Sequence, residues 1–569
     1  MENAIRIGAV AAVAALGLAG CLGTRPPARA QAAAIEVPAI ARPGGETPEW
    51  WFRAGAAAAQ RARAGTAGQA RNLIVFLGDG MSIGTIAAAR ILEGQRRGDS
   101  GEENRLSFED FPYTALSRTY ETDQQTPDSA GTMSAIMTGV KTRAGVIGVT
   151  QRVPRGDCAA LAGNEAASLL ELAAAAGMAT GIVTTARLTH ATPAATYGHQ
   201  PDRHWEHDGA MPASAHAQGC IDLARQFVAF PFPLDLALGG GRARFLPATQ
   251  PDPERPGTTG LRRDGRDLVA EWLRRPGAVY VWNADQLAAI DPAAAGPVLG
   301  LFEPGHMNYQ HERARDAGGE PGLAEMTRVA IERLARKPHG YFLMVEAGRI
   351  DHAHHAGNAF RALDETIALS DAVRTAVAMT DAADTLILVT ADHAHTMSFV
   401  GYPVRGNPIL GLVRGVAHED DNESGPVLDL LGRPYTTLGY ANGPGYAGAS
   451  QAQGAGAKRF PHAPRTVEPA VGRPDLAAID TTDPDYLQEA LLPLASESHS
   501  GEDVAVFARG PGAEAVRGSL EQNVLFHLLA QASEPIRRTL CRIGSCTAQG
   551  VPVHLPDRRR LLPVTRGER

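Results

Sequence analysis

Short apolar runs at six places along this chain constrain its fold most strongly. Each run is mostly apolar throughout instead of alternating with polar residues, which is typical of strands buried on both faces. Alanine-rich stretches such as 165–177 and 360–380 lie between the runs and favour helices. This alternation predicts an α/β fold in which helices cover both faces of a large, mostly parallel central sheet. The runs are 73–77, 179–183, 234–238, 341–345, 385–389 and 504–507.

The balance of charge restricts the partners of the chain. Its 569 residues, enough to bury a large core, include 62 acidic and 54 basic side chains and have a formal net charge of -8. No dense stretch of lysine or arginine stands out, which argues against a nucleic-acid-binding surface. A small anionic substrate would instead need local positive charge, such as that of bound metal ions.

The first residues resemble an export signal. Arg6 precedes an alanine-rich apolar stretch, 7–19, that is too short to span a membrane. Residues 1–20 are therefore predicted to be a lipoprotein-type signal peptide, with Cys21 as the acylated residue that anchors the protein. In the alternative, a secretory signal is cut near residues 30–32 and Cys21 is lost. Both interpretations predict an exported protein, either periplasmic or anchored to the membrane as a lipoprotein.

Export changes how the other four cysteines are interpreted. An even set of cysteines in an oxidising compartment favours disulfides, and no Cys-x-x-Cys pair supports the alternative of a metal thiolate site. Cys541 and Cys546 are close enough in sequence to close a small loop, and Cys158 would then pair with Cys220.

Changes in composition suggest where domains begin and end. Residues 21–70 are expected to form a linker and an N-terminal helix. Residues 71–400 and 497–550 carry the alternation of strands and helices and are expected to form the main domain. Residues 401–496 are rich in Gly, Pro, Asn and Asp and are predicted to be a turn-rich insertion, whereas 551–569 form a C-terminal tail.

Carboxylates and imidazoles recur directly after three of the apolar runs. These positions matter because ligands of an open parallel sheet bind beyond the carboxyl ends of its strands. Each residue alone could be a turn residue or a solvated histidine, but together they indicate metal sites, with His and Asp suited to zinc and Glu to magnesium. The residues are Asp79, then Glu346, Asp351, His352, His354 and His355, then Asp392, His393 and His395, to which His499 is added before 504–507.

The segment 126–135, TPDSAGTMSA, begins a predicted helix and contains Ser129. Ser129 is either the N-cap of this helix, whose hydroxyl satisfies a free backbone N–H, or a nucleophile at the positive end of the helix dipole. A zinc ion beside Ser129 would lower the pKa of its hydroxyl, and a second zinc ion would activate water. The small residues at 130–132 would leave room for a phosphate to approach.

Several long motifs occur in order from about Asn72 to the region of Cys541 and Cys546. They are NLIVFLGDGM, TPDSAGTMSAIMTGVKT, VTTARLTHATPAATYGH, GRIDHAHH, VTADHAH and SHSGEDVAVFARGP. Through these motifs the chain resembles the alkaline phosphatases of the vertebrate-like, serine-nucleophile type. The resemblance implies hydrolysis of phosphate monoesters to an alcohol and inorganic phosphate through a phosphoserine intermediate, with two zinc ions and one magnesium ion. It also implies a homodimer, and it identifies 401–496 with the crown of the family, which contributes to the dimer interface.

The resemblance implies a role for each matching residue. Ser129 matches the nucleophile, Arg203 the arginine that holds two phosphate oxygens, and Asp128 the residue that orients this arginine. His190 and His352 stand where some bacterial members have Asp and Lys, and they are expected to reach the third metal and the phosphate, respectively, through water. The implied ligands are Asp351, His355 and His499 for the first zinc, Asp79, Asp392, His393 and Ser129 for the second, and Asp79, Thr192 and Glu346 for magnesium, with His395 supporting a ligand.

Vertebrate members of the family suggest a further, calcium-like site. Glu254, the carbonyl of Phe302 and Glu303 match three of its ligands, and Glu320 lies near the fourth after a short insertion. In the alternative, these acids are merely solvated.

Two other functions are weighed against phosphate monoester hydrolysis. The chain could be a phosphodiesterase or sulfatase on the same scaffold, or a non-catalytic exported lipoprotein that binds metal or phosphate. Arg203 and the complete set of residues implied to bind the third metal favour a monoesterase, since they recognise the non-bridging oxygens of a dianionic monoester. An intact nucleophile beside intact metal ligands argues against the non-catalytic alternative.

Overall fold

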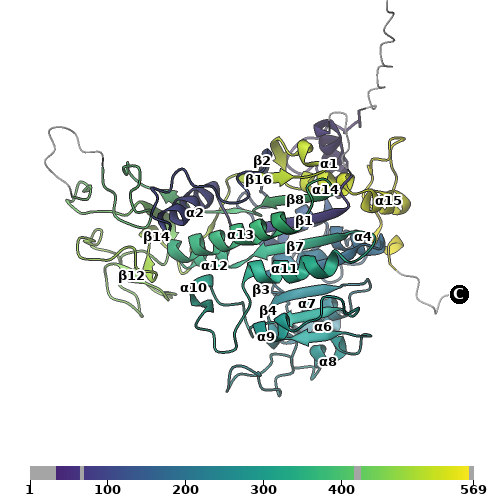
Figure 1. Cartoon of the computed structure of the whole chain (residues 1–569), viewed down its shortest axis with the longest axis horizontal. Coiled ribbons are helices and arrows are strands. Elements are labelled where there is room, and N and C mark those ends of the chain that lie inside the picture. The colour runs from purple at the N-terminus through teal and green to yellow at the C-terminus, as the bar shows by residue number, and fades with distance from the viewer. Residues whose placement is uncertain (1–33, 64–68, 416–424, 563–569) are drawn as a thin grey trace, which may run out of the picture. The chain divides into compact units, whose positions relative to one another are not determined.

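The computed structural model describes residues 34–63, 69–415 and 425–562. The predicted signal peptide and Cys21 lie outside these residues. A ten-stranded sheet forms the centre of the unit that begins at Ile35, in the order β17-β2-β16-β8-β1-β7-β3-β4-β6-β5 (Figure 1). Its strands are β1 (Asn72–Gly78), β2 (Tyr113–Arg118), β3 (Ala179–Arg187), β4 (Leu236–Gly240), β5 (Val279–Val281), β6 (Val298–Leu301), β7 (Tyr341–Ala347), β8 (Thr385–Thr390), β16 (Val504–Arg509) and β17 (Gly518–Glu521).

The predicted mostly parallel sheet is confirmed. Among the ten strands, β16 alone runs antiparallel to its neighbours β8 and β2. Five of the six predicted apolar runs lie within strands of this sheet, and the sixth, 234–238, begins two residues before β4. The central strands β7, β8 and β4 are buried along their whole length, as expected for strands covered on both sides.

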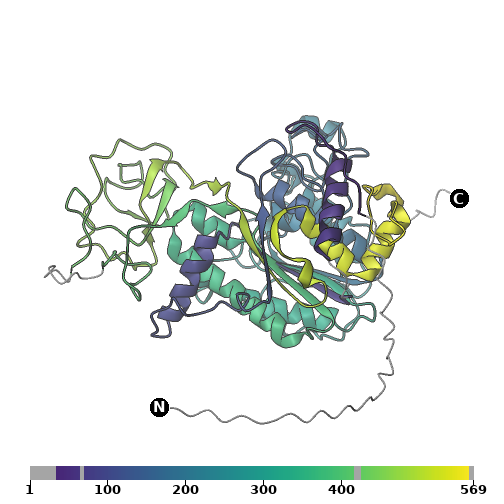
Figure 2. The same ribbon diagram turned by 90° about the horizontal axis from the view of Figure 1, so that it is seen from above.

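Alternate side chains of each strand face two separate cores. In β1, Leu73, Val75 and Leu77 belong to one core, whereas Ile74 and Phe76 belong to the other. Helices α1, α3, α4 and α14 pack on the first face, and α2, α11 and α13 pack on the second (Figures 1 and 2). Their bounds are α1 Pro48–Ala62, α2 Ile83–Gln95, α3 Ser129–Thr138, α4 Leu169–Ala175, α11 Leu323–Leu334, α13 Ala359–Met379 and α14 Val524–Ala532.

The two helices predicted from alanine content are both present. The helix expected at 360–380 is α13, displaced by one residue. The helix expected at 165–177 is the shorter α4, because Ser168 and Glu171 form a capping box that fixes its start. The remaining α-helices are α5 Ala191–Tyr197, α6 Ala213–Ala217, α7 Leu223–Val228, α8 Leu268–Trp272, α9 Ala284–Ala288, α10 Gln310–Arg313, α12 Arg349–His355 and α15 Glu534–Ile543. Among the described helices, none combines the length and apolarity needed to cross a membrane.

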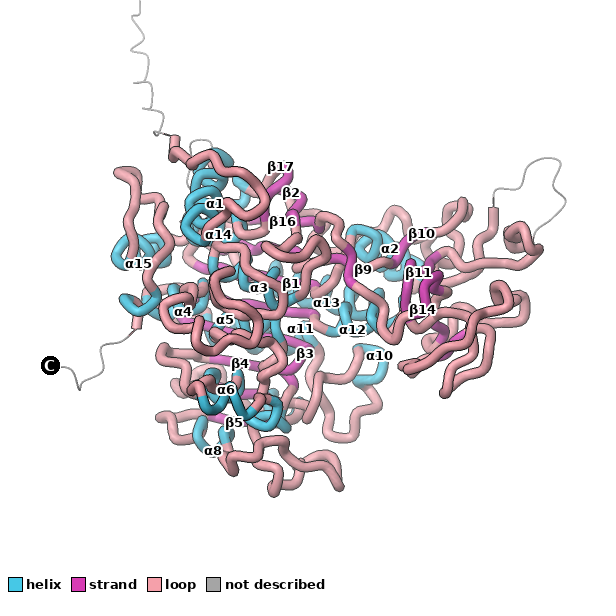
Figure 3. The backbone as a smooth tube through the Cα atoms, turned by 180° about the vertical axis from the view of Figure 1, so that it is seen from behind, coloured by secondary structure: helices cyan, strands magenta, loops and turns pink. Residues whose placement is uncertain are grey.

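The segment 401–496 consists mainly of loops, as Figure 3 shows, and contains no helix in its described part. A small three-stranded sheet of β10, β11 and β14 connects this segment to the main sheet. Strand β10 begins shortly after the end of β8 and pairs with β11, which belongs to the segment. The interpretation of this segment as a crown that forms a dimer interface stays a prediction. The small strands are β9 Ala394–His395, β10 Met397–Phe399, β11 Leu438–Gly443, β12 Lys458–Arg459, β13 Tyr486–Leu487, β14 Ala490–Pro493 and β15 His499–Ser500.

Both predicted disulfides are confirmed. Cys158 is bonded to Cys220 across 62 residues of sequence, and Cys541 to Cys546 across 5.

Candidate active site and metal centre

The polar residues that follow the apolar runs meet at one edge of the sheet. Strands β1, β7 and β8 are adjacent and parallel, so their carboxyl ends lie side by side. Asp79 follows β1, Glu346 lies near the end of β7, and Asp392 and His393 follow β8. The short strands β9 and β15 pair His395 with His499 and add the latter residue to this edge.

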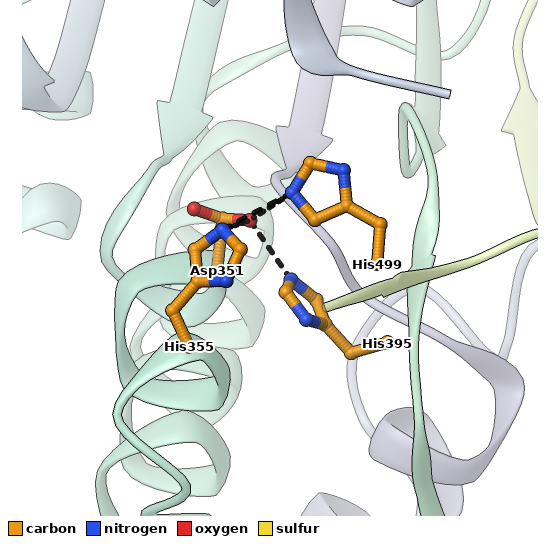
Figure 4. Close-up of side chains that lie close together, drawn as sticks. All are labelled: Asp351, His355, His395 and His499. Atoms are coloured by element: carbon orange, nitrogen blue, oxygen red, sulfur yellow. Dashed lines mark hydrogen bonds and ion pairs between the residues drawn. The ribbon is translucent and has the colours of Figure 1, made fainter. Parts of the chain in front are cut away.

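One group of possible metal ligands combines a carboxylate with three imidazoles (Figure 4). Asp351 Oδ1 lies 3.3 Å from His355 Nε2 and 3.2 Å from His499 Nε2, and these two nitrogens are 3.1 Å apart. The opposite nitrogens are engaged elsewhere, since Nδ1 of His355 lies 2.5 Å from the carbonyl of Glu497 and Nδ1 of His499 lies 2.7 Å from that of Pro127. A carbonyl can only accept, so both Nδ1 atoms carry the proton and both Nε2 lone pairs face the carboxylate, as in a metal site.

His395 belongs to the same group but differs from the other two histidines. Its Nδ1 lies 2.5 Å from Glu497 and its Nε2 lies 2.8 Å from Asp351. Burial alone would lower the pKa of His395, but Glu497 and Asp351 together raise it to about 10. A doubly protonated imidazole donates from both nitrogens and has no lone pair for a metal. The geometry therefore suits a residue that orients Asp351.

Two further groups share the Asp79 carboxylate. One contains Asp79, Asp351 and His393, and the other contains Asp79, His190 and Glu346. Oxygen Oδ1 of Asp79 and Oε1 of Glu346 are buried without a hydrogen-bond partner among the described residues. Burial and neighbouring carboxylates raise the pKa of Asp79 well above its usual range, and burial raises that of Glu346 to about 7. Buried carboxylates with unpaired oxygens can stay ionised only beside cations. The donor set of these two groups therefore fits divalent metals.

The remaining predicted ligands lie around these groups. Nε2 of His393 is 3.1 Å from Ser129 Oγ and 3.4 Å from both Asp79 Oδ1 and Asp392 Oδ2. The hydroxyl of Thr192 lies 3.5 Å from the other oxygen of Asp79. The structure thus brings together the sets predicted for the second zinc and for magnesium.

Asp128, and not Ser129, is the N-cap of α3. The carboxylate of Asp128 accepts a hydrogen bond from Gly131 N at 3.0 Å, and Ser129 is the first residue of the helix. The interpretation of Ser129 as a cap is therefore wrong. Its buried hydroxyl instead points to His393 at the positive end of a ten-residue helix.

Arg203 lies directly beside this helix start. It donates from Nη1 to Asp128 Oδ2 at 2.9 Å, and its Nη2 lies 3.1 Å from His190 Nε2. Although burial opposes ionisation, Arg203 and the backbone N–H groups of Gly145 and Gly131 lower the pKa of Asp128 to about 2. A charged pair therefore fixes the guanidinium beside the start of the helix that carries Ser129.

A further histidine, His306, lies beside His190 and His352 and was not predicted from the sequence. The rings of His306 and His352 lie 4.0 Å apart, and those of His306 and His190 lie 5.3 Å apart. His306 also contacts the guanidinium of Arg187. Since it lies in a loop after β6, outside every motif used above, only tertiary structure could reveal it.

The calcium-like group differs from the predicted set. Glu254, Glu303 and Asp316 offer oxygens close to one another, and Glu320 is not part of this group. The carboxylate of Glu320 instead accepts from Asn308 N at 2.8 Å. Arginines already pair with two acids of the group, Arg242 with Glu254 at 2.7 Å and Arg255 with Glu303 at 2.8 Å. Phe302, whose carbonyl was another predicted ligand, is buried.

The sequence of this chain is similar to known proteins along most of its length. Residues 70–534 match the family described as Alkaline phosphatase. An alkaline phosphatase of Gadus morhua is 43% identical over 471 residues, which cover 82% of this chain and 92% of that protein. The tissue-nonspecific isozyme of Rattus norvegicus is 42% identical over 471 residues, which cover 82% and 84%. The solved alkaline phosphatase of Thermus thermophilus, 24% identical, superposes with a TM-score of 0.57 over 83% of this chain and 96% of that one, and so shares its fold.

Proposed function

Because the chain belongs to the alkaline phosphatase family and is a metal-binding phosphomonoesterase, we propose that Ser129 and Arg203 carry its reaction inside a three-metal centre. The proposal rests on several polar groups that come together at one place in the structure. One buried hydroxyl, one guanidinium fixed by a carboxylate and three groups of possible metal ligands face the same edge of the sheet. These parts are what transfer of a phosphoryl group to a side chain requires.

Substrate binding is assigned to Arg203. Two of its nitrogens are fixed by Asp128 and His190, and the guanidinium has five N–H donors in total. The remaining donors can hold two non-bridging oxygens of a phosphate in bidentate fashion. His352, whose ring lies 5.4 Å from that of His190, is expected to contact the same phosphate through water.

Ser129 then performs the transfer. Its Oγ attacks phosphorus, the bond to the alcohol breaks, and a phosphoserine forms at the positive end of α3, which favours the added negative charge. Water then attacks the phosphoserine and releases inorganic phosphate, which restores the hydroxyl. Metal ions bound at the three groups supply the acidity of the hydroxyl and of the water and offset charge on the phosphoryl oxygens.

We assign the metals by donor chemistry. Imidazole and carboxylate donors suit zinc, held by Asp351, His355 and His499 at one site and by Asp79, Asp392, His393 and Ser129 at the next. Oxygen donors suit magnesium, which Asp79, Thr192 and Glu346 would hold, with His190 reaching it through water. A calcium ion at Glu254 and Glu303 stays a prediction, and the arginines beside these acids make them a poorer fit.

Localisation and assembly remain predictions of the same proposal. Two disulfides suit an oxidising compartment, in line with export and with a lipid anchor at Cys21. A homodimer built through 401–496 is expected from the family.

One experiment tests the proposal against its alternatives. The purified protein, supplied with zinc and magnesium, should hydrolyse p-nitrophenyl phosphate at alkaline pH far faster than the bis-ester or the sulfate. Ser129→Ala should abolish most of this activity, whereas Ser398→Ala, at an exposed serine of β10, should retain it. Comparable rates on the bis-ester would favour a phosphodiesterase. No activity at full zinc occupancy would favour the non-catalytic alternative, and metal analysis should find two zinc ions and one magnesium ion per chain.

A further inference from the structure

One strand of the segment 401–496 reaches the candidate metal centre. Strand β11 pairs with β14 on one side and with β10 on the other (Figure 3), and β10 begins two residues after β9, which carries His395. Tyr440 and Asn442 are two residues apart in β11, so their side chains point to the same face of the strand. Both side chains contact segments that carry the first metal group, by which we mean Asp351, His355 and His499.

Tyr440 contacts helix α12 through His354. The hydroxyl of Tyr440 lies 2.8 Å from His354 Nδ1, and the opposite nitrogen, Nε2, lies 3.0 Å from Thr85 Oγ1. Tyr440 is 5% exposed and His354 is fully buried. Because both of its ring nitrogens have a partner, His354 is fixed between β11 and the first turn of α2. It directly precedes His355 in α12, and its ring stacks on that of His395 with the centroids 4.8 Å apart.

Asn442 contacts the segment that carries His499. Its Oδ1 accepts a hydrogen bond from Ser498 N at 2.9 Å, and its Nδ2 donates to Ser498 Oγ at 3.0 Å. The next residue, Gly443, approaches Glu497 so closely that an added Cβ atom would lie 2.9 Å from the Cβ of Glu497. Its φ of 132° also favours glycine. Strand β11 therefore holds the two residues that directly precede His499.

We propose that Tyr440 and Asn442 are positioning residues of the first metal group. Tyr440 acts on α12, which carries two of the three ligands, and Asn442 acts on the residue directly before the third. The group needs such support because its ligands come from two separate segments, and a metal site requires each ligand to be held in place by its neighbours. This inference rests on the proposed assignment of the first metal group to zinc. Strand β11 thereby contributes to the metal centre of its own chain, whatever the role of its segment in a dimer.

Zinc titration of the purified enzyme tests this role. Tyr440→Phe removes one hydroxyl and keeps the ring, whereas Asn442→Ala removes both contacts with Ser498. In competition with a chelator, each variant should raise the dissociation constant of one zinc ion about 5- to 10-fold, the scale of a hydrogen bond lost beside a metal ligand, and should leave the other zinc ion unaffected. At saturating zinc, kcat should return to within about 2-fold of the original value, because the ligands themselves are intact. Zinc would not reverse a general folding defect in this way.

Two further variants are matched controls. Asn442→Asp keeps an oxygen that can accept from Ser498 N and a second oxygen that can accept from the Ser498 hydroxyl, so it should not weaken zinc binding. Tyr402→Phe, at a tyrosine of the same segment that is 92% exposed, should leave zinc binding unchanged.

The outcomes separate this inference from the proposed function. Asp351→Ala should lose one zinc ion per chain, and if it keeps both, the zinc assignment of the first metal group itself fails. If Asp351→Ala loses zinc but Tyr440→Phe and Asn442→Ala bind zinc as the original enzyme does, the positioning role is refuted. It is also refuted if Asn442→Asp is as defective as Asn442→Ala, or if excess zinc does not restore kcat. Tyr440→Phe, which removes a single oxygen atom, decides the question even where Asn442→Ala does not fold.

Discussion

Removal of the Cys158–Cys220 disulfide should destabilise the protein about twice as much as removal of Cys541–Cys546. A disulfide lowers the conformational entropy of the unfolded chain, and this effect grows with the logarithm of the number of residues in the closed loop. The first bond spans 62 residues and the second spans 5. The loop-closure relation then gives about 4 kcal/mol for the first bond and about 2 kcal/mol for the second at room temperature.

The first disulfide should also affect the phosphate site. Cys158 and Cys220 pack with Trp205, Met211 and Ala215 in a small core of their own. Trp205 is two residues from Arg203 in sequence, and its carbonyl accepts from Leu223 N at 3.0 Å, so this core holds the segment that carries the guanidinium. The double variant Cys158→Ala/Cys220→Ala should therefore bind inorganic phosphate more weakly, whereas Cys541→Ala/Cys546→Ala should not.

Urea unfolding of the metal-loaded double variants provides the assay. Tryptophan fluorescence follows unfolding, and Trp205 of the first core is one of the five tryptophans that contribute to it. The midpoint should fall in both variants and fall further without Cys158 and Cys220, and phosphate inhibition measured without urea should weaken in that variant alone. Equal losses of stability, or a larger loss without Cys541 and Cys546, would refute the loop-length reasoning. Unchanged phosphate inhibition would refute the link to Arg203.

Three other predictions follow from the site. Asp128→Ala should lower the free energy of unfolding by about 3 kcal/mol, because it removes the cap of α3 and leaves Gly145 N without its acceptor. Asp128→Asn keeps an oxygen that can accept from both Gly131 N and Gly145 N, so it should lose less stability in the same urea assay. Glu497→Gln should weaken zinc binding about 10-fold or more in competition with a chelator, because Glu497 orients His395 and, through it, Asp351. In chelator-treated protein, the free energy of unfolding should fall as pH rises from 4.5 to about 7. Burial raises the pKa of Glu346, so the folded protein keeps this proton at pH values at which the unfolded chain has lost it. Calorimetry at several pH values should show this fall in the free energy of unfolding without metals and should not show it once metals are bound.

The parts of the fold that were predictable are those where one local signal dominates. Continuous apolar runs identified six of the ten strands, and each run lies at least partly on a strand of the central sheet. Strands β17 and β2 escaped because exposed and buried positions mix along them, and β5 and β6, at the opposite end of the sheet, escaped because runs of three and four residues give a weak signal. The antiparallel direction of β16 was equally hidden, because an apolar run does not encode direction and only pairing with β2 and β8 fixes it.

The candidate site likewise contains residues that could be predicted from the sequence and residues that could not. The possible metal ligands Asp79, Glu346 and Asp392 lie at or just after the ends of strands, so the sheet itself brings them together and their positions could be inferred. His306 and Glu497 lie in loops, and each gains its place at the site from a contact made across the fold. No periodicity or spacing in the sequence marks such residues.

The proposed role of Ser129 as the nucleophile is compatible with the structure because a different residue, Asp128, caps the helix. A serine that caps a helix must turn its hydroxyl oxygen back to a backbone N–H, and this oxygen would then be unavailable to a phosphate. Here the carboxylate of Asp128 caps α3 through Gly131 N, so the hydroxyl of Ser129 is free to face His393. The same carboxylate pairs with Arg203, so a single residue sets both the start of the helix that carries Ser129 and the position of the proposed phosphate-binding group. A substitution at Asp128 should therefore alter helix stability and phosphate affinity together.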